Sequence, residues 1–60
     1  MEIKPKDIPT EIKVIRVSLG LNQKDFAKEI GATKLMVSKW ERGLSKISAE
    51  TMDRLREMVR

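Results

Sequence analysis

Three glycines divide this chain into four blocks, each long enough for one short helix. Gly20, Gly31 and Gly43 each follow a segment whose apolar residues recur at the spacing of an α-helix. A glycine just past such a segment can adopt the positive φ at which many helices end. Strand signals are weak, because the apolar residues do not alternate. The pattern predicts an all-α fold.

The length of the chain limits how these helices can be stabilised. Sixty residues form at most one domain, and a chain of this size buries only about 60% of the surface that it exposes when unfolded. The sequence has no cysteine and no histidine, which excludes disulfides and cysteine-based zinc sites. We therefore expect a compact four-helix domain with a small, efficiently packed apolar core.

Capping residues predict where the helices begin. The expected helices cover about residues 10–19, 23–30, 33–42 and 48–59, with Thr10, Asn22, Thr33 and Ser48 as their N-caps. Pro5 and Pro9 discourage a helix near the start of the chain. Residues 1–9 are thus predicted to form an N-terminal arm and residues 10–60 the folded domain.

The apolar stripes of these helices predict the core. The first helix has Ile8, Ile12, Ile15 and Leu19 on one stripe, the second buries Phe26, Ala27 and Ile30, and the fourth has Met52, Leu55 and Val59. A helical wheel of the third block places Val37, Trp40 and Leu44 on one side and Leu35, Ser38, Lys39 and Arg42 on the other. The second of these sides is expected to be exposed.

Residues 21–43 are the most informative segment, because very few residues separate the second and third predicted helices. A turn this tight does not let two helices lie antiparallel, so they must cross steeply. Ala27 supplies the small side chain that such a crossing needs, and Gly31 lets the backbone turn without a Cβ clash. Residues 22–43 are predicted to form a helix-turn-helix unit.

This segment resembles the helix-turn-helix family of phage repressors, Cro proteins and their bacterial regulator relatives. The similarity covers residues 12–47 and rests on Arg16, the Leu21-Asn22-Gln23 opening, Ala27, Gly31, Val37, Trp40 and the Glu41-Arg42-Gly43 ending. It implies a DNA-binding transcriptional regulator, expected to be a repressor, without a cofactor. Relatives often have a fifth helix, so either the domain is cut from something longer or Met58 and Val59 form a dimer contact.

The resemblance implies that the third helix enters the major groove of double-stranded DNA, which admits one α-helix and displays a distinct pattern for each base pair. Its first turn and the residue one turn on would then reach base edges, namely Thr33, Lys34, Leu35, Met36 and Lys39. Lys34 and Lys39 can donate to guanine, and Leu35 can contact a thymine methyl group. Ser38 adds a hydroxyl to the same exposed side. Met36 lies at the border and is equally suited to fill the core.

Four further residues are predicted to hold DNA phosphates. Asn22 and Gln23 lie at the start of the second helix, where side-chain amides and free backbone N–H groups can bind an anion. Capping is the alternative role for this pair, and in relatives the glutamine also braces the recognition helix or touches DNA. Arg42 and Lys46 would flank the groove, and Lys4 and Lys6 of the arm would add diffuse attraction.

Two charged residues are expected to have a structural role instead. The resemblance implies an ion pair that joins Arg16 in the first helix to Glu41 at the end of the third. If this pair is partly buried, removal of one partner leaves an uncompensated charge.

Composition agrees with a nucleic-acid partner and argues against an enzyme. The chain has 13 Lys and Arg against 9 Asp and Glu, a net charge of +4, which favours a polyanion but also suits ordinary solubility. Its carboxylates are scattered beside Lys or Arg and suggest neither a metal cluster nor a nucleophile–base pair. The first ten residues contain no signal peptide or membrane span, so a cytoplasmic location is expected.

Two functions stay open at this point. In the first, the domain is a sequence-specific regulator that binds as a homodimer to half-sites about one DNA turn apart, because one helix contacts too few bases for much specificity. In the second, Leu35 and Met36 belong to a surface for a protein partner. An antitoxin that binds a toxin and represses its own operon would combine the two.

Overall fold

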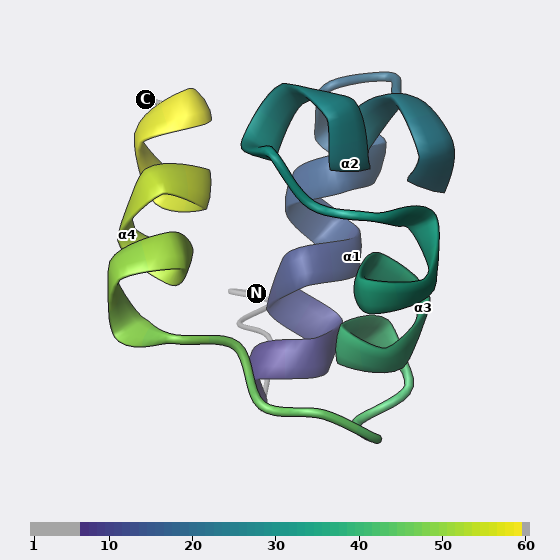
Figure 1. Ribbon diagram of the computed structural model, residues 1–60. Helices are drawn as coiled ribbons and strands as arrows, with labels where there is room; N and C mark the ends of the chain where they lie inside the picture. Colours follow the sequence, from purple (N-terminus) through teal and green to yellow (C-terminus); the bar gives the residue numbers. More distant parts are fainter. Residues whose placement is uncertain (1–6, 60) are drawn as a thin grey trace.

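A computed structural model describes residues 7–59, which form four helices and no strand. The helices are α1 (Ile8–Ser18), α2 (Gln23–Ile30), α3 (Lys34–Glu41) and α4 (Ala49–Met58). In Figure 1, α1 runs through the middle of the domain with α3 on one side and α4 on the other, and α2 lies at the end where α1 finishes. The predicted all-α, four-helix architecture is confirmed.

The starts of α2, α3 and α4 follow from their capping side chains. Asn22, Thr33 and Ser48 each accept a hydrogen bond from the backbone N–H three residues further on, at 2.7, 3.1 and 3.2 Å. Each bond satisfies one of the N–H groups that the first turn of a helix leaves unpaired. These three predicted starts are confirmed, and α1 to α3 each end close to one of the three glycines.

The predicted start of α1 at Thr10 is wrong. The helix begins at Ile8, and its N-cap is Asp7, whose carboxylate accepts a hydrogen bond from the Thr10 N–H at 2.9 Å. In the first turn a proline such as Pro9 has no helical hydrogen bond to lose, and its fixed φ suits the helix. Residues 7–9 therefore belong to α1 and its cap, not to an arm.

The basic residues expected in the arm, Lys4 and Lys6, lie outside the described residues 7–59. Their attraction to DNA therefore stays a prediction.

The core lies where the four helices meet, and each helix contributes to it. Its buried side chains are Ile12, Ile15, Phe26, Ala27, Ile30, Val37, Trp40, Met52 and Leu55. All of them lie on the stripes that the sequence predicts to be buried. Their burial holds α2 and α3 against α1, and this sets the orientation of the helix-turn-helix unit.

Three apolar residues expected on these stripes are exposed instead. The exposed fraction is 63% for Leu44, 43% for Val59 and 39% for Ile8. The helical wheel placed Leu44 beside Trp40, but α3 has ended by then and Gly43 has a φ of 74°, so the chain has left the helical path. Ile8 is the first residue of α1 and Val59 is the C-cap of α4. Both therefore lie at helix ends, where the apolar stripe extends beyond the core.

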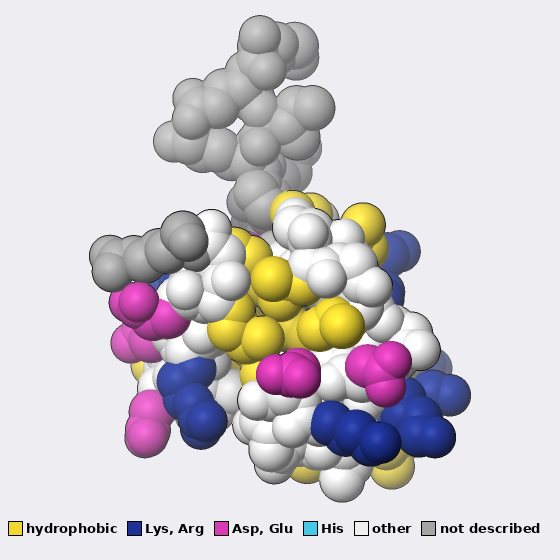
Figure 2. Space-filling view, turned by 90° about the horizontal axis from the view of Figure 1, so that it is seen from above, with side chains coloured by type: hydrophobic (Ala, Val, Ile, Leu, Met, Phe, Trp, Pro, Cys, Tyr) yellow, Lys and Arg dark blue, Asp and Glu magenta, His cyan; other side chains and the backbone are white. Residues whose placement is uncertain are grey.

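At one end of the domain, hydrophobic side chains reach the surface. Figure 2 views this end, where α1 and α4 both finish, and hydrophobic side chains gather in the middle of the face. Leu19 and Met58, at the ends of these two helices, pack against the core but are only partly buried.

An ion pair that the sequence analysis missed links α1 to α4. Arg56 donates through Nε and Nη2 to the two carboxylate oxygens of Glu11, at 2.8 and 3.1 Å. The hydrogen bond from Arg56 lowers the pKa of Glu11. Because solvent reaches both side chains, this pair contributes little to stability.

Candidate nucleic-acid interface

Helices α2 and α3 are joined by only residues 31–33 and pack against each other. Gly31 adopts φ 71° and ψ 30°, in the left-handed region, and the Ala32 N–H donates back to the Ala27 carbonyl at 2.8 Å. Ala27 is 2% exposed, so its small side chain lies where the helices are in close contact. The turn predicted at Gly31 and the buried position of Ala27 are both confirmed.

The rotation of α3 about its own axis is fixed by two buried side chains. Val37 and Trp40 are 0% and 6% exposed, and burying an apolar side chain of this size stabilises the fold by about 1.5–3 kcal/mol. The opposite side of the helix is open, since Leu35 is 61% exposed and Lys39 is also exposed. The predicted division of α3 into a buried and an exposed side is confirmed for these four residues.

The six residues predicted to reach base edges all lie on α3 or at its N-cap. Thr33, Lys34, Leu35, Met36 and Lys39 are exposed, and Ser38 is half-buried. The Thr33 hydroxyl already accepts the capping hydrogen bond. Met36 is 43% exposed, so it is not a core residue. Lys34 and Lys39 form no ion pair with other residues of the described chain, and their charges are available to a ligand.

A largely buried ion pair fixes the C-terminal end of α3. Arg16 donates to the two oxygens of Glu41, from Nε at 2.7 Å and from Nη2 at 3.2 Å. Its Nη1 donates to the carbonyl of Leu21 at 2.9 Å. The side chains of Arg16 and Glu41 are only 15% and 5% exposed. The pair that the resemblance implied is present, and it ties α3 to α1 and to the turn that follows α1.

Gln23 and Asn22, at the start of α2, differ in what their side chains can offer to DNA. The Gln23 amide donates to Glu41 Oε1 at 3.3 Å, so this side chain braces α3. Asn22 uses its amide oxygen as the N-cap, and its amide nitrogen makes no hydrogen bond to the residues described. That nitrogen is free to donate to a phosphate.

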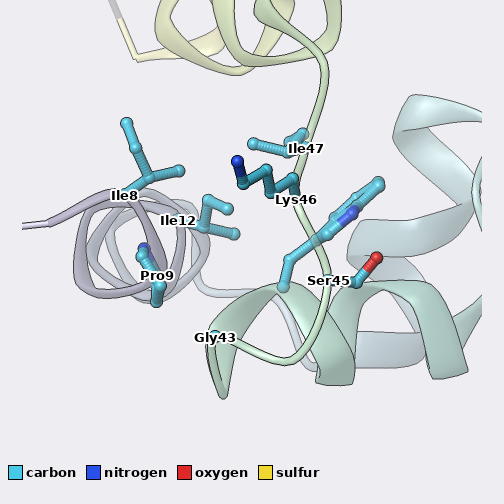
Figure 3. A pocket seen from close by; sticks show the side chains of 8 residues that line it. Ile8, Pro9, Ile12, Gly43, Ser45, Lys46 and Ile47 are labelled. Atoms are coloured by element: carbon cyan, nitrogen blue, oxygen red, sulfur yellow. The ribbon is translucent and has the colours of Figure 1, made fainter.

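The structure separates the two cations that were predicted to flank the groove. Arg42 directly follows α3 as its C-cap and is exposed. Lys46 lies further along the loop, and Figure 3 shows its side chain extending toward Ile8 and Ile12 of α1. Arg42 therefore adjoins the exposed side of α3, whereas the amine of Lys46 points toward α1.

Residues 7–59 contain neither a candidate metal site nor a membrane-spanning helix. Nowhere in this stretch do three or more His, Cys, Asp or Glu side chains gather as they would to hold a metal ion. Its helices are too short or too polar for any of them to cross a membrane.

Comparison with known proteins adds one finding. Residues 12–58 match a family model described as helix-turn-helix, a stretch that contains all of α2, α3 and α4. Neither the curated proteins nor the solved structures include a significant match.

Proposed function

Because the chain belongs to the Cro-like helix-turn-helix family of DNA-binding transcription regulators, we propose that it inserts α3 into the major groove of duplex DNA and recognises a specific sequence there. The observation that carries this proposal is the division of α3 into two sides. Val37 and Trp40 anchor one side in the core, and the other projects Leu35 and Lys39 into solvent. The helix is therefore held rigidly while its outer side stays available.

The exposed side chains of α3 suit base edges. Lys34 and Lys39 can donate to the O6 and N7 acceptors of guanine, and Leu35 can pack against the methyl group of thymine. Thr33, Met36 and Ser38 complete the candidate contacts, with Ser38 the least accessible of them. A well-placed bidentate hydrogen-bonded pair, such as a lysine on guanine, discriminates against a wrong base by about 1–3 kcal/mol.

Phosphate contacts would set the register of α3 in the groove. Asn22 offers a free side-chain amide, Gln23 a backbone N–H in the first turn of α2, and Arg42 an exposed guanidinium beside α3. A helix N-terminus favours an anion through its unpaired N–H groups and its dipole. Lys46 would contribute long-range attraction, since its amine points toward α1.

The regulator acts as a homodimer and, in this proposal, as a repressor. One α3 spans too few base pairs for high specificity, and helix-turn-helix proteins usually pair on half-sites about one DNA turn apart. Two copies on one face of the duplex would place two α3 helices in successive major grooves.

A salt titration of DNA binding tests the proposal. With a sequence selected from randomised duplexes, the logarithm of the binding constant should fall linearly with the logarithm of the salt concentration, by about 0.9 for each phosphate neutralised. Arg42→Gln should lessen this slope by about one unit. Arg54→Gln is the matched control, because it removes an exposed cation from α4, which lies across α1 from α3. Absence of binding to any duplex at low salt would contradict the proposal.

A protein-interaction module is the second candidate, because Leu35 and Met36 are neighbouring exposed apolar side chains. In this case the domain resembles an antitoxin, with α3 binding a protein partner and DNA binding secondary. Leu35→Ser separates the two candidates. It should weaken binding to the selected duplex if Leu35 reads a base, and unchanged DNA affinity would favour the protein partner.

A further inference from the structure

A cavity of about 300 Å³ lies between the start of α1 and the loop that follows α3. Its walls are formed by Ile8, Pro9, Ile12, Trp40, Gly43, Ser45, Lys46 and Ile47. Figure 3 shows the side chains of α1 on one side of it and those of the loop on the other. The walls are mostly apolar, and the volume lies at the lower end of the range for small-molecule sites.

Trp40 contributes a polar group that has no partner in the described part of the chain. The residue is 6% exposed, and its indole N–H donates no hydrogen bond to residues 7–59. Yet no side-chain nitrogen or oxygen in this stretch is both fully buried and unpaired. The N–H therefore keeps some access to solvent, and Trp40 is one of the residues that line the cavity.

Lys46 contributes an unpaired charge. Its side chain lies across the cavity and reaches toward Ile8 and Ile12 (Figure 3), and it forms no ion pair within residues 7–59. Glu11, which also lies on α1, already has a partner, because its Oε2 lies 2.8 Å from the Nε of Arg56. Within residues 7–59, the cavity thus combines apolar walls with a cation that no carboxylate pairs with.

We propose that this cavity binds a small apolar carboxylate. Its hydrocarbon part packs against Ile8, Ile12 and Ile47, and its carboxylate meets the Lys46 ammonium, while the Trp40 indole forms part of the cavity wall. A charge-assisted hydrogen bond is about twice as strong as a neutral one, so the site selects an acid over its amide. The apolar walls select a hydrocarbon acid over an inorganic anion.

The proposal does not depend on DNA binding, and its test needs no DNA. Trp40 is the only tryptophan of the chain, so its indole N–H gives a single side-chain signal in a proton–nitrogen correlation spectrum. The whole chain is titrated with cyclohexanecarboxylate. The uncharged control is cyclohexanecarboxamide, and acetate is the control that lacks the ring.

Cyclohexanecarboxylate should shift the indole signal and the amide signals of Ile12 and Ile47 until they saturate. Cyclohexanecarboxamide should bind about tenfold more weakly, as expected when about 1.4 kcal/mol is lost, and acetate should bind more weakly still, because it lacks the ring that the apolar walls bury. The Lys46→Gln variant should bind cyclohexanecarboxylate about tenfold more weakly than the wild type. Lys28→Gln, which removes an exposed cation from α2, should leave its affinity unchanged.

Three results would overturn the proposal. The first is the absence of a saturable shift at the indole signal, and the second is an equal affinity for the carboxylate and its amide. The third is an unchanged carboxylate affinity in Lys46→Gln, which would mean that the cation does not take part.

Discussion

At the scale of single residues, the contact between Arg16 and Glu41 has a large consequence for stability. Both side chains are largely removed from solvent, and the guanidinium also donates to the Leu21 carbonyl. Bringing two charges out of water costs free energy, so the intact pair adds little net stability. Loss of one partner is different, because it leaves the other charge buried and uncompensated.

Replacing either partner alone should therefore destabilise the domain strongly. Arg16→Met and Glu41→Met should each lower the free energy of unfolding by about 3 kcal/mol. A domain of 60 residues has only about 3–9 kcal/mol in total. The double variant should lose clearly less than the sum of the two. Thermal and urea unfolding of the four proteins measure this, and strictly additive losses would show that the two residues are not coupled.

Asp7 gives the start of α1 a stability that depends on pH. The backbone N–H of Thr10 donates to its carboxylate at 2.9 Å, and this hydrogen bond, with a smaller contribution from the Thr10 side chain, lowers the pKa of Asp7 below the ordinary value of 3.8. A carboxyl group whose pKa is lower in the folded state stabilises the fold above its unfolded pKa. That contribution is lost as the pH falls through the folded pKa.

Asp7→Ala should accordingly lower Tm at neutral pH, and the gap to the wild type should narrow once the pH falls below 3.8. The measurement is the Tm of both proteins from neutral to strongly acidic pH. A gap of constant size over this range would mean that ionisation of Asp7 does not contribute.

At the scale of the elements, some helix ends can be predicted from the local sequence and others cannot. Both ends of α2 could be predicted, because Asn22 and Gly31 are local signals for a start and an end. The start of α1 is harder to predict, because Pro9 discourages a helix in most positions, although an aspartate before a first-turn proline is itself a start signal. The position predicted for Leu44 is wrong because a helical wheel does not apply past the end of α3.

The candidate site, like the helix ends, can be predicted from the sequence only in part. Helical periodicity predicted the exposed side of α3, and family resemblance implied the pair between Arg16 and Glu41. The direction of Lys46 could not be predicted, because it depends on how the loop after α3 packs against α1. The Glu11–Arg56 pair joins residues 45 positions apart, and no local pattern indicates it.

The turn between α2 and α3 should be sensitive to any side chain that resists its conformation. Gly31 has a φ of +71°, and a Cβ added there would meet nothing within 4 Å. Gly31→Ala should therefore cost only the backbone strain, about 1–2 kcal/mol. Gly31→Asn should cost less, since asparagine adopts this region more readily. Urea unfolding compares the two, and equal losses would argue that the left-handed backbone is not the cause.

For the molecule as a whole, the arrangement of charge is consistent with DNA binding on the side of the domain that carries α3. Lys34, Lys39 and Arg42 lie on or directly after α3, and the described structure pairs none of them with a carboxylate. On α4, by contrast, Arg56 is paired with both Asp53 and Glu11. The net charge of +4 supplies the attraction to DNA, but only base contacts from α3 can supply specificity.

The most direct test of the account is therefore the ratio of affinities for a selected duplex and a scrambled duplex of the same length, compared between the wild type and Lys39→Gln. If α3 reads base edges, Lys39→Gln should weaken binding to the selected duplex by about tenfold, a loss of about 1.4 kcal/mol. Binding to the scrambled duplex should change little, so the ratio falls, whereas Arg54→Gln should leave it unchanged. If Lys39→Gln weakens both duplexes by the same factor, or neither, then Lys39 does not read base edges and the account is contradicted.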